Sequence, residues 1–284
     1  MASAKEIRTQ IKAIQNTGKI TKAMEMVAAS KMRKAQDRVI AARSYSEGVK
    51  RVVGNLMKAH PEYKHPFLVE RDEIRKVGVI AITTDKGLCG GLNTNTLKTA
   101  LQLMKAQKSE IEVFTLGRRA GMFMRRVGAD IQGVIENISD TPELTDILGI
   151  VTLVMDRYMN GDLDEVHLVY SEFVNTMTQE PTAMRLLPCP LPEEEESAYW
   201  DYIYEPEAKD VLEGVLKRYV ESIVYHGVLE NKACEQSARM VAMKAATDNA
   251  KEIVKDLSIT YNKARQAAIT QELAEICAGA AAAG

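Results

Sequence analysis

The sequence predicts an α/β protein with a coiled coil, in which two long terminal helices pair antiparallel and a mainly parallel, Rossmann-like α/β domain is inserted between them. All eight prolines lie between residues 61 and 206. Because proline removes a helix donor and clashes with the preceding turn, the proline-free ends can form very long helices. Apolar residues recur every three or four positions at both ends, whereas strand-like and helix-like patterns alternate in the middle. We therefore expect a coiled-coil helix over 1–60, the α/β domain over 75–192 and a second coiled-coil helix over 207–284.

The N-terminal helix has a marked start and an unusual middle. Ser3 and Glu6 have the S-x-x-E spacing of a capping box, which satisfies N–H groups that the first helical turn leaves free. Between residues 20 and 27 the helix is apolar almost all round, and such a helix is normally buried on every side. About 55 helical residues span about 80 Å, well beyond a small domain. The residues that form its apolar stripe, mostly three or four positions apart, are Ile7, Ile11, Ile14, Ala28, Met32, Ala35, Val39, Ala42, Val49, Val53 and Leu56.

The C-terminal helix begins near Pro206, where a first-turn proline is tolerated, and has neither Gly nor Pro between Val228 and Ala278. Its small and apolar seam predicts pairing with the N-terminal helix. The last ten residues, 275–284, are nearly uncharged, which suggests that this tip inserts into a sleeve made by another protein. A disordered Ala/Gly tail is the alternative. The seam consists of Met243, Ala246, Ala250, Ile253, Leu257, Thr260, Ala264 and Ala267.

The middle of the chain alternates between strand and helix patterns, which is typical of a mainly parallel sheet. The run at 77–83 is continuously apolar, as in a strand that is covered on both faces. We expect further strands at 112–116, 130–138 and 165–174, an extended piece at 182–187, and helices at 94–107, 118–127 and 141–159.

Charge is sorted along the chain, although the formal net charge is only -2. Residues 1–58 carry 13 Lys/Arg against 4 Asp/Glu, whereas residues 207–284 carry 10 against 11, so the middle is strongly acidic. This asymmetry suggests that different parts face different partners. A basic helix could bind nucleic acid, and a nucleic-acid-binding adaptor or coiled-coil scaffold is one alternative function. However, the basic cluster coincides with an apolar belt at 24–29, which suits acidic protein loops better than a DNA groove.

Cysteine spacing and hydropathy indicate the cellular compartment. The four cysteines are far apart and form no C-x-x-C pair, so neither a zinc site nor a disulfide framework is expected, and a reducing cytoplasm is favoured. No signal peptide or transit peptide opens the sequence, which favours a bacterial source. The longest apolar stretch, near 147–155, is too short to span a membrane, so any membrane association would come through partners.

A glycine-rich loop at 83–93 lies between a predicted strand and a predicted helix, where α/β proteins often bind phosphates. It matches neither of the common nucleotide-binding motifs, so a tight turn is the favoured interpretation and a nucleotide-binding enzyme the alternative. Cys89 is expected to be a small buried apolar residue. The sequence contains no catalytic constellation, metal cluster or cofactor motif. The loop residues of interest are Lys86, Gly87, Cys89, Gly90 and Gly91.

Four segments together resemble the gamma subunit family of F-type ATP synthases. The segment 11–32 looks like the family's N-terminal helix, and 84–93 resembles its second landmark. Residues 269–280 match the C-terminal signature I-T-x-E-x-x-[DE]-x-x-x-G-A, and residues 239–249 are also similar. These landmarks occur in the right order, so the resemblance covers the whole chain.

The resemblance implies a non-catalytic rotor. In that family one copy of the chain turns inside a ring of alpha and beta subunits. Its α/β domain, with the epsilon subunit, binds the membrane ring of c subunits. Rotation driven by proton flow then drives ATP synthesis on the ring, and the chain also regulates ATP hydrolysis. The resemblance implies no cofactor, no nucleic acid, and a peripheral position on the cytoplasmic face of the bacterial inner membrane. It places contacts with the ring at Lys22, Met24, Arg239, Arg265, Gln266, Thr270 and Glu272.

Overall fold

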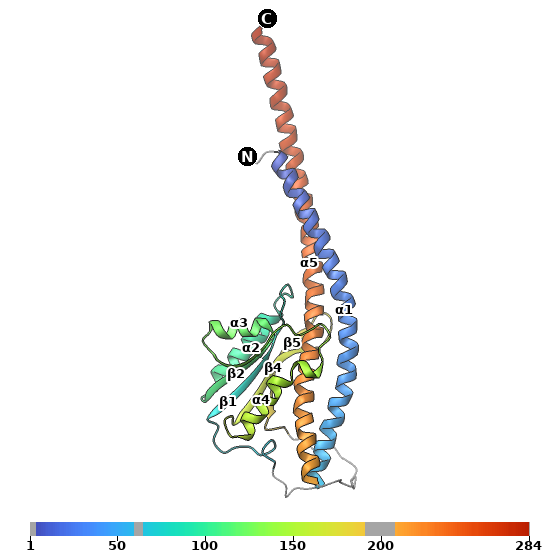
Figure 1. Ribbon diagram of the computed structural model, residues 1–284. Coiled ribbons are helices and arrows are strands. Elements are labelled where there is room, and N and C mark those ends of the chain that lie inside the picture. Colours follow the sequence, from blue (N-terminus) through green and yellow to red (C-terminus); the bar gives the residue numbers. More distant parts are fainter. Residues whose placement is uncertain (1–3, 60–64, 191–207, 284) are drawn as a thin grey trace. The chain divides into compact units, whose positions relative to one another are not determined.

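The computed structural model describes residues 4–59, 65–190 and 208–283 (Figure 1). Two helices are much longer than the rest, α1 (Ala4–Ala59) and α5 (Ala208–Ala283). The chain divides into two compact units, one formed by residues 1–28 and 240–284 and the other by residues 29–239. Both long helices contribute to both units.

The unit 29–239 contains a five-stranded sheet of order β3-β2-β1-β4-β5. The first four strands are parallel and β5 is antiparallel to β4. The fold class predicted from the sequence, two long terminal helices with an inserted and mostly parallel sheet, is confirmed. The elements are β1 (Lys76–Ile82), α2 (Leu92–Ala106), β2 (Glu110–Leu116), α3 (Arg118–Arg126), β3 (Asp130–Ile135), η1 (Leu144–Asp146), α4 (Leu148–Met159), β4 (Glu165–Phe173) and β5 (Gln179–Leu187).

Helices cover both faces of this sheet, as expected for parallel strands. Successive residues of β1 point to opposite faces. Val79 and Ala81 pack in one apolar cluster with residues of α2 and α3, whereas Ile80 and Ile82 pack in a larger cluster with residues of α4 and α5. The first part of α5, up to Val228, therefore belongs to the core of the α/β domain.

The structure differs from the sequence prediction near residue 141. The predicted helix 141–159 is replaced by the short helix η1 followed by α4, which begins only at Leu148. Glu143 and Asp146 form a reciprocal capping box around η1, in which the Asp146 carboxylate accepts a 2.9 Å hydrogen bond from the Glu143 N–H. These carboxylates satisfy backbone donors that a longer α-helix would have used, so the regular helix starts later.

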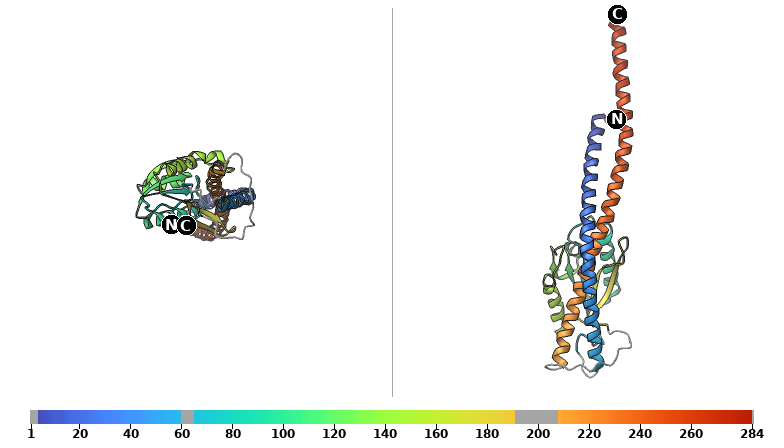
Figure 2. Two further views of the ribbon diagram at one scale, coloured as in Figure 1. Left: turned by 90° about the horizontal axis from the view of Figure 1, so that it is seen from below. Right: turned by 90° about the vertical axis from the view of Figure 1, so that its right-hand side faces the viewer.

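The unit formed by residues 1–28 and 240–284 pairs the start of α1 with the later part of α5. The Thr21 and Thr247 hydroxyl groups lie 2.7 Å apart, and a Cβ added to Gly18 would lie 3.4 Å from the Cβ of Ala250. Because the earlier residue of α1, Gly18, contacts the later residue of α5, Ala250, the two segments are antiparallel. Both views show the two segments side by side (Figures 1 and 2). The predicted antiparallel pairing is thus present in this unit.

Residues 265–280 of α5 are exposed at every position. In the part of the chain that the structure describes, no helix combines the length and the apolar character that crossing a membrane requires.

Candidate functional site

The candidate site is a stretch of α5, Glu230–Arg239, that lies against the carboxyl ends of the parallel strands. Every residue from Glu230 to Ala238 is buried, including charged side chains that are normally found in water. Burying a charged or polar group is costly unless it is paired and hydrogen-bonded. The partners of these side chains therefore explain why α5 lies where it does.

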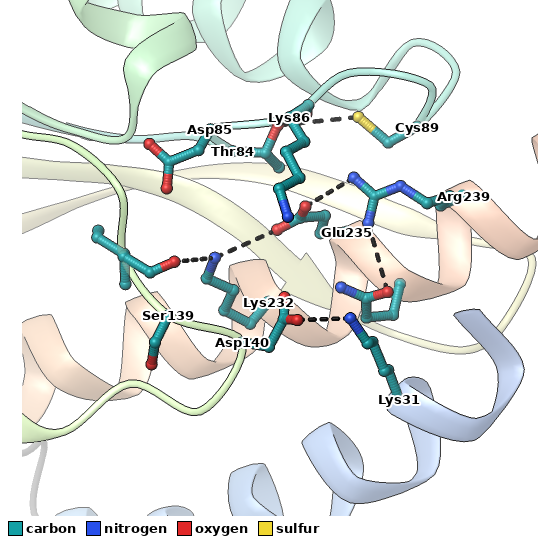
Figure 3. Close-up of polar contacts among 12 residues, drawn as sticks. Lys31, Thr84, Asp85, Lys86, Cys89, Ser139, Asp140, Lys232, Glu235 and Arg239 are labelled. Carbon is teal, nitrogen blue, oxygen red and sulfur yellow. Dashed lines mark hydrogen bonds and ion pairs between the residues drawn. The ribbon is translucent and has the colours of Figure 1, made fainter. Parts of the chain in front are cut away.

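Three charged residues form one connected network on α5 (Figure 3). The Lys232 ammonium donates to the Ile138 carbonyl oxygen at 3.0 Å and lies 3.5 Å from the Glu235 carboxylate. The same carboxylate accepts a 2.7 Å hydrogen bond from the Arg239 guanidinium, which also donates to the Gly87 carbonyl oxygen at 3.1 Å. One carboxylate thus joins two cations, and each cation reaches the backbone of a different loop.

Polar side chains of a second set bind strand β4 and the turn after it. The Glu230 carboxylate accepts a 2.8 Å hydrogen bond from the Phe173 N–H, and the Ser237 hydroxyl donates to the Thr176 carbonyl oxygen at 2.6 Å. The Cys234 thiol lies 3.4 Å from the Ser171 carbonyl oxygen.

The ionisation of Glu230 reflects these contacts. Burial raises the pKa of its carboxyl group, but hydrogen bonds from His226 and the Phe173 N–H, with the positive charge of Arg43, outweigh burial and leave the pKa below its ordinary value. Glu230 is therefore ionised at neutral pH although its side chain is buried.

The glycine-rich loop is a tight turn held by its own side chains. Leu88 and Gly90 have positive φ angles of 64° and 57°, and only glycine adopts that region without strain. The Thr84 N–H donates to Asn93 Oδ1 at 3.0 Å, and Asn93 Nδ2 donates to the Cys89 sulfur at 3.3 Å. This network closes the turn.

Cys89 in this loop is buried in an apolar cluster with Leu92, Cys234 and Ala238. Burial raises the pKa of its thiol, so at neutral pH Cys89 is a protonated, weakly nucleophilic group. Its environment is that of a small apolar residue, which is what the sequence predicts for it.

Helix α1 contacts the same region through an ion pair between Lys31 and Asp140, a residue of the loop after β3. The two side chains are 43% and 42% exposed. The hydrogen bond from Lys31 holds the pKa of the Asp140 carboxyl group below its ordinary value. Water and salt screen a pair this exposed, so its contribution to stability is small.

Asp140→Asn is expected to destabilise the chain by only about 0.5 kcal/mol at pH 7. Because the folded-state pKa of Asp140 is depressed, its contribution is complete above the unfolded-state value of about 3.9 and is lost as the pH falls through the lower folded-state value. Urea unfolding of both proteins between pH 7 and pH 2, each with and without Lys31→Met, measures this difference. The ion pair would be contradicted if the difference did not shrink as the pH falls below about 3.9, or if it remained in the Lys31→Met background.

The structure brings only one of the predicted contact residues to this site. Arg239 lies against the glycine-rich loop and is bonded within its own chain. In the other unit, Lys22 is exposed and paired with Glu25 at 2.9 Å, and Met24 is half-buried. The remaining contact residues are exposed on the last part of α5: Arg265, Gln266, Thr270 and Glu272.

Sequence reasoning did not single out Glu230, Lys232 and Glu235. Opposite charges three or four residues apart are usually a solvated helix face, so their spacing alone did not distinguish burial from exposure. The available signal was the low charge around them, since Leu229, Ala233 and Cys234 are apolar. The ranges 4–59, 65–190 and 208–283 contain no group of three or more His, Cys, Asp or Glu residues placed to hold a metal ion.

Comparison with known proteins identifies the family. A family model described as ATP synthase matches residues 3–283. The ATP synthase gamma chain of Thiobacillus denitrificans is 55% identical over 289 residues, covering 99% of this chain and 100% of that protein. Gamma chains of Legionella pneumophila, strain Corby, and of Coxiella burnetii are 51% and 52% identical, again over 99% of this chain and at least 99% of each relative. This chain belongs to the ATP synthase gamma chain family.

Two solved structures of mitochondrial ATP synthases contain a chain with the same fold. A chain of the central stalk and c-ring structure of the Tetrahymena thermophila mitochondrial ATP synthase is 26% identical, with a TM-score of 0.62, covering 80% of this chain and 99% of that chain. A chain of the Euglena gracilis ATP synthase in rotational state 3 has a TM-score of 0.68 at 18% identity, covering 98% of this chain and 94% of that chain. The family resemblance read from the sequence is confirmed by the family model and by the gamma chain relatives.

Proposed function

We propose that this chain is the central rotor shaft of an F-type, proton-translocating ATP synthase. It couples proton flow through the membrane sector to ATP synthesis or hydrolysis on a ring of alpha and beta subunits, and it regulates ATP hydrolysis. The observation that carries the proposal, beside family membership, is the exposed end of α5. Over residues 265–280 this helix keeps large apolar side chains although every position is open to water.

The apolar side chains of this end form one stripe. Ile269, Leu273 and Ile276 are 48%, 57% and 68% exposed, and their spacing places them on one helix face. Burying such a stripe contributes about 25 cal/mol per Å² of apolar area, so a partner that encloses the helix is favoured. We propose that the alpha and beta subunits form this enclosure. Arg265, Gln266, Thr270 and Glu272, together with Lys22 and Met24 of α1, would then contact the ring.

The chain acts on its neighbours and carries out no chemistry itself. A shaft changes the state of a ring subunit only if it contacts the different states unequally, and an asymmetric pair of helices meets that condition. Nucleotide chemistry then takes place on the ring subunits. One copy of the chain turns in each complex, and its α/β domain binds the epsilon subunit and the c-subunit ring. Through these partners it is held peripherally at the cytoplasmic face of the bacterial inner membrane.

Reconstitution with purified alpha, beta and epsilon subunits tests this function. We expect a stable complex whose ATP hydrolysis drives rotation of a gold rod on this chain, and no binding of ATP or NAD to the isolated chain by calorimetry. Salt-sensitive binding of DNA, with no complex formed, would favour the scaffold or adaptor alternative instead. Nucleotide binding by the isolated chain would favour the enzyme alternative.

Leu273→Asp tests the enclosed stripe at a single position. The side chain is exposed in the isolated chain, so its thermal unfolding should change little. In the complex, the charge would have to enter an apolar sleeve, and we expect assembly and ATP hydrolysis to be lost. Leu273→Met keeps an apolar side chain and serves as the matched control, with activity close to the parent. Full activity of Leu273→Asp would show that the stripe is not enclosed.

A further inference from the structure

We propose that six side chains of α5 form a two-sided clasp that locks the helix to the α/β domain and transmits torque between them. The clasp consists of Glu230, Lys232, Cys234, Glu235, Ser237 and Arg239. This inference rests on the proposed rotor function and names the residues that would make shaft and domain turn as one body. All the contacts that carry it lie within the unit 29–239.

The clasp residues fall on two opposite faces of α5. At 3.6 residues per turn, Lys232, Glu235 and Arg239 lie within an arc of about 60°, and Glu230, Cys234 and Ser237 lie within another, with the two centres about 165° apart. The first face reaches the loops after β3 and β1, through the carbonyl groups of Ile138 and Gly87.

The second face reaches strand β4 and the turn that follows it, through the backbone of Ser171, Phe173 and Thr176. In the sheet, β1 and β3 lie on one side of β4. The backbone of the domain therefore holds α5 from two opposite sides. A turning force about a helix axis is resisted best by restraints on opposite sides, because together they act as a couple.

Apolar packing and the clasp restrain α5 in different ways. The apolar clusters around the clasp contain small residues such as Ala233 and Ala238 beside larger ones such as Leu92 and Leu229, and the preceding part of α5 packs in the main core. Hydrophobic attraction has no preferred direction. Hydrogen bonds, in contrast, weaken steeply when the donor angle departs from linearity. The clasp therefore adds directional restraints to this packing.

The burial of charge in the clasp also points to a positioning role. Replacing a buried ion network by apolar residues of similar size is often neutral or stabilising, so such a network is weak evidence for a role in stability alone. The Lys232 and Glu235 side chains are 8% and 3% exposed. Side chains buried to this extent have no surface to offer a partner subunit. A function in fixing the angle of α5 accounts for charges in this position.

The test uses the complex with alpha and beta subunits fixed to a surface and stalled by a non-hydrolysable ATP analogue. A gold rod is attached to the exposed α2–β2 turn through Lys108→Cys, with Cys277→Ser removing the exposed native thiol. The angular fluctuation of the rod reports the stiffness between domain and ring. We expect the triple variant Lys232→Met/Glu235→Leu/Arg239→Met, which leaves no buried charge unpaired within the triad, to broaden this fluctuation and to lose proton pumping more than ATP hydrolysis.

The matched control removes another ion pair within the same helix, Arg218 and Glu221, whose side chains lie 2.8 Å apart. Arg218→Met/Glu221→Leu should leave the fluctuation unchanged. If the triple variant does not fold, the same measurement is made on Lys232→Met. In this variant Glu235 keeps Arg239 as its partner while the hydrogen bond to Ile138 is lost, so the fluctuation should still broaden. An unchanged fluctuation in a folded clasp variant would overturn the clasp. Failure of the parent complex to assemble or rotate would instead contradict the proposed function.

Discussion

Gly117→Ala is expected to destabilise the chain by about 3 kcal/mol or more, one of the two largest effects that the structure predicts. Gly117 connects β2 to α3 with φ 100° and ψ 141°, a region that is essentially restricted to glycine. A Cβ at this position would lie 2.3 Å from the Thr83 carbonyl oxygen and 2.8 Å from its carbon. These are backbone atoms at the end of β1, so relief of the clash would require the two parallel strands to move apart.

The control for this variant is Gly128→Ala. Gly128 also has a positive φ angle, 71°, but a Cβ added to it would meet no atom within 4 Å. Its substitution carries only the conformational strain, about 1 kcal/mol. Urea unfolding of the two purified variants, followed by circular dichroism and extrapolated linearly to water, gives the difference. Equal losses for both variants would mean that the Thr83 contact is not tight.

Patterns confined to a few neighbouring residues were sufficient to predict most elements of the fold. The bounds of the predicted strand 77–83 differ from those of β1 by one residue at each end. The bounds of the predicted helix 94–107 differ from those of α2 by at most two residues. These elements depend on local periodicity and on breakers such as glycine, which the sequence shows directly. The late start of α4 was missed because the capping box of Glu143 and Asp146 competes locally with the helix.

The candidate site was less predictable, because it depends on contacts between distant parts of the chain. The order of strands in the sheet, including the antiparallel position of β5, has no local signature. Lys232 and Glu235 are buried because loops after β1 and β3 meet on one side of α5, which neither residue's neighbours reveal. The same holds for Arg239, which the resemblance placed in contact with other subunits and which the structure shows bonded to Glu235 and Gly87.

Ala250→Pro is expected to have the second large effect, at about 3 kcal/mol or more, because proline removes a helix hydrogen bond and clashes with the preceding turn. Ala250 is 8% exposed and faces Gly18 of α1. A kink at this position would also separate the Thr21–Thr247 contact, one turn away. In vesicles that contain the reconstituted complex, we expect proton pumping to fall more than ATP hydrolysis, since a kinked shaft still touches the ring but transmits its rotation poorly.

Ala250→Gly separates the kink from the loss of helix propensity. It weakens the same position by about 1 kcal/mol without removing a hydrogen bond donor or introducing a clash. We therefore expect Ala250→Gly to keep the parent's ratio of pumping to hydrolysis, whereas Ala250→Pro lowers it. Equal losses of both activities in Ala250→Pro would point to misassembly of the complex. An assembled Ala250→Pro complex that keeps the parent's ratio of pumping to hydrolysis would show that the continuity of α5 is not what couples the two activities.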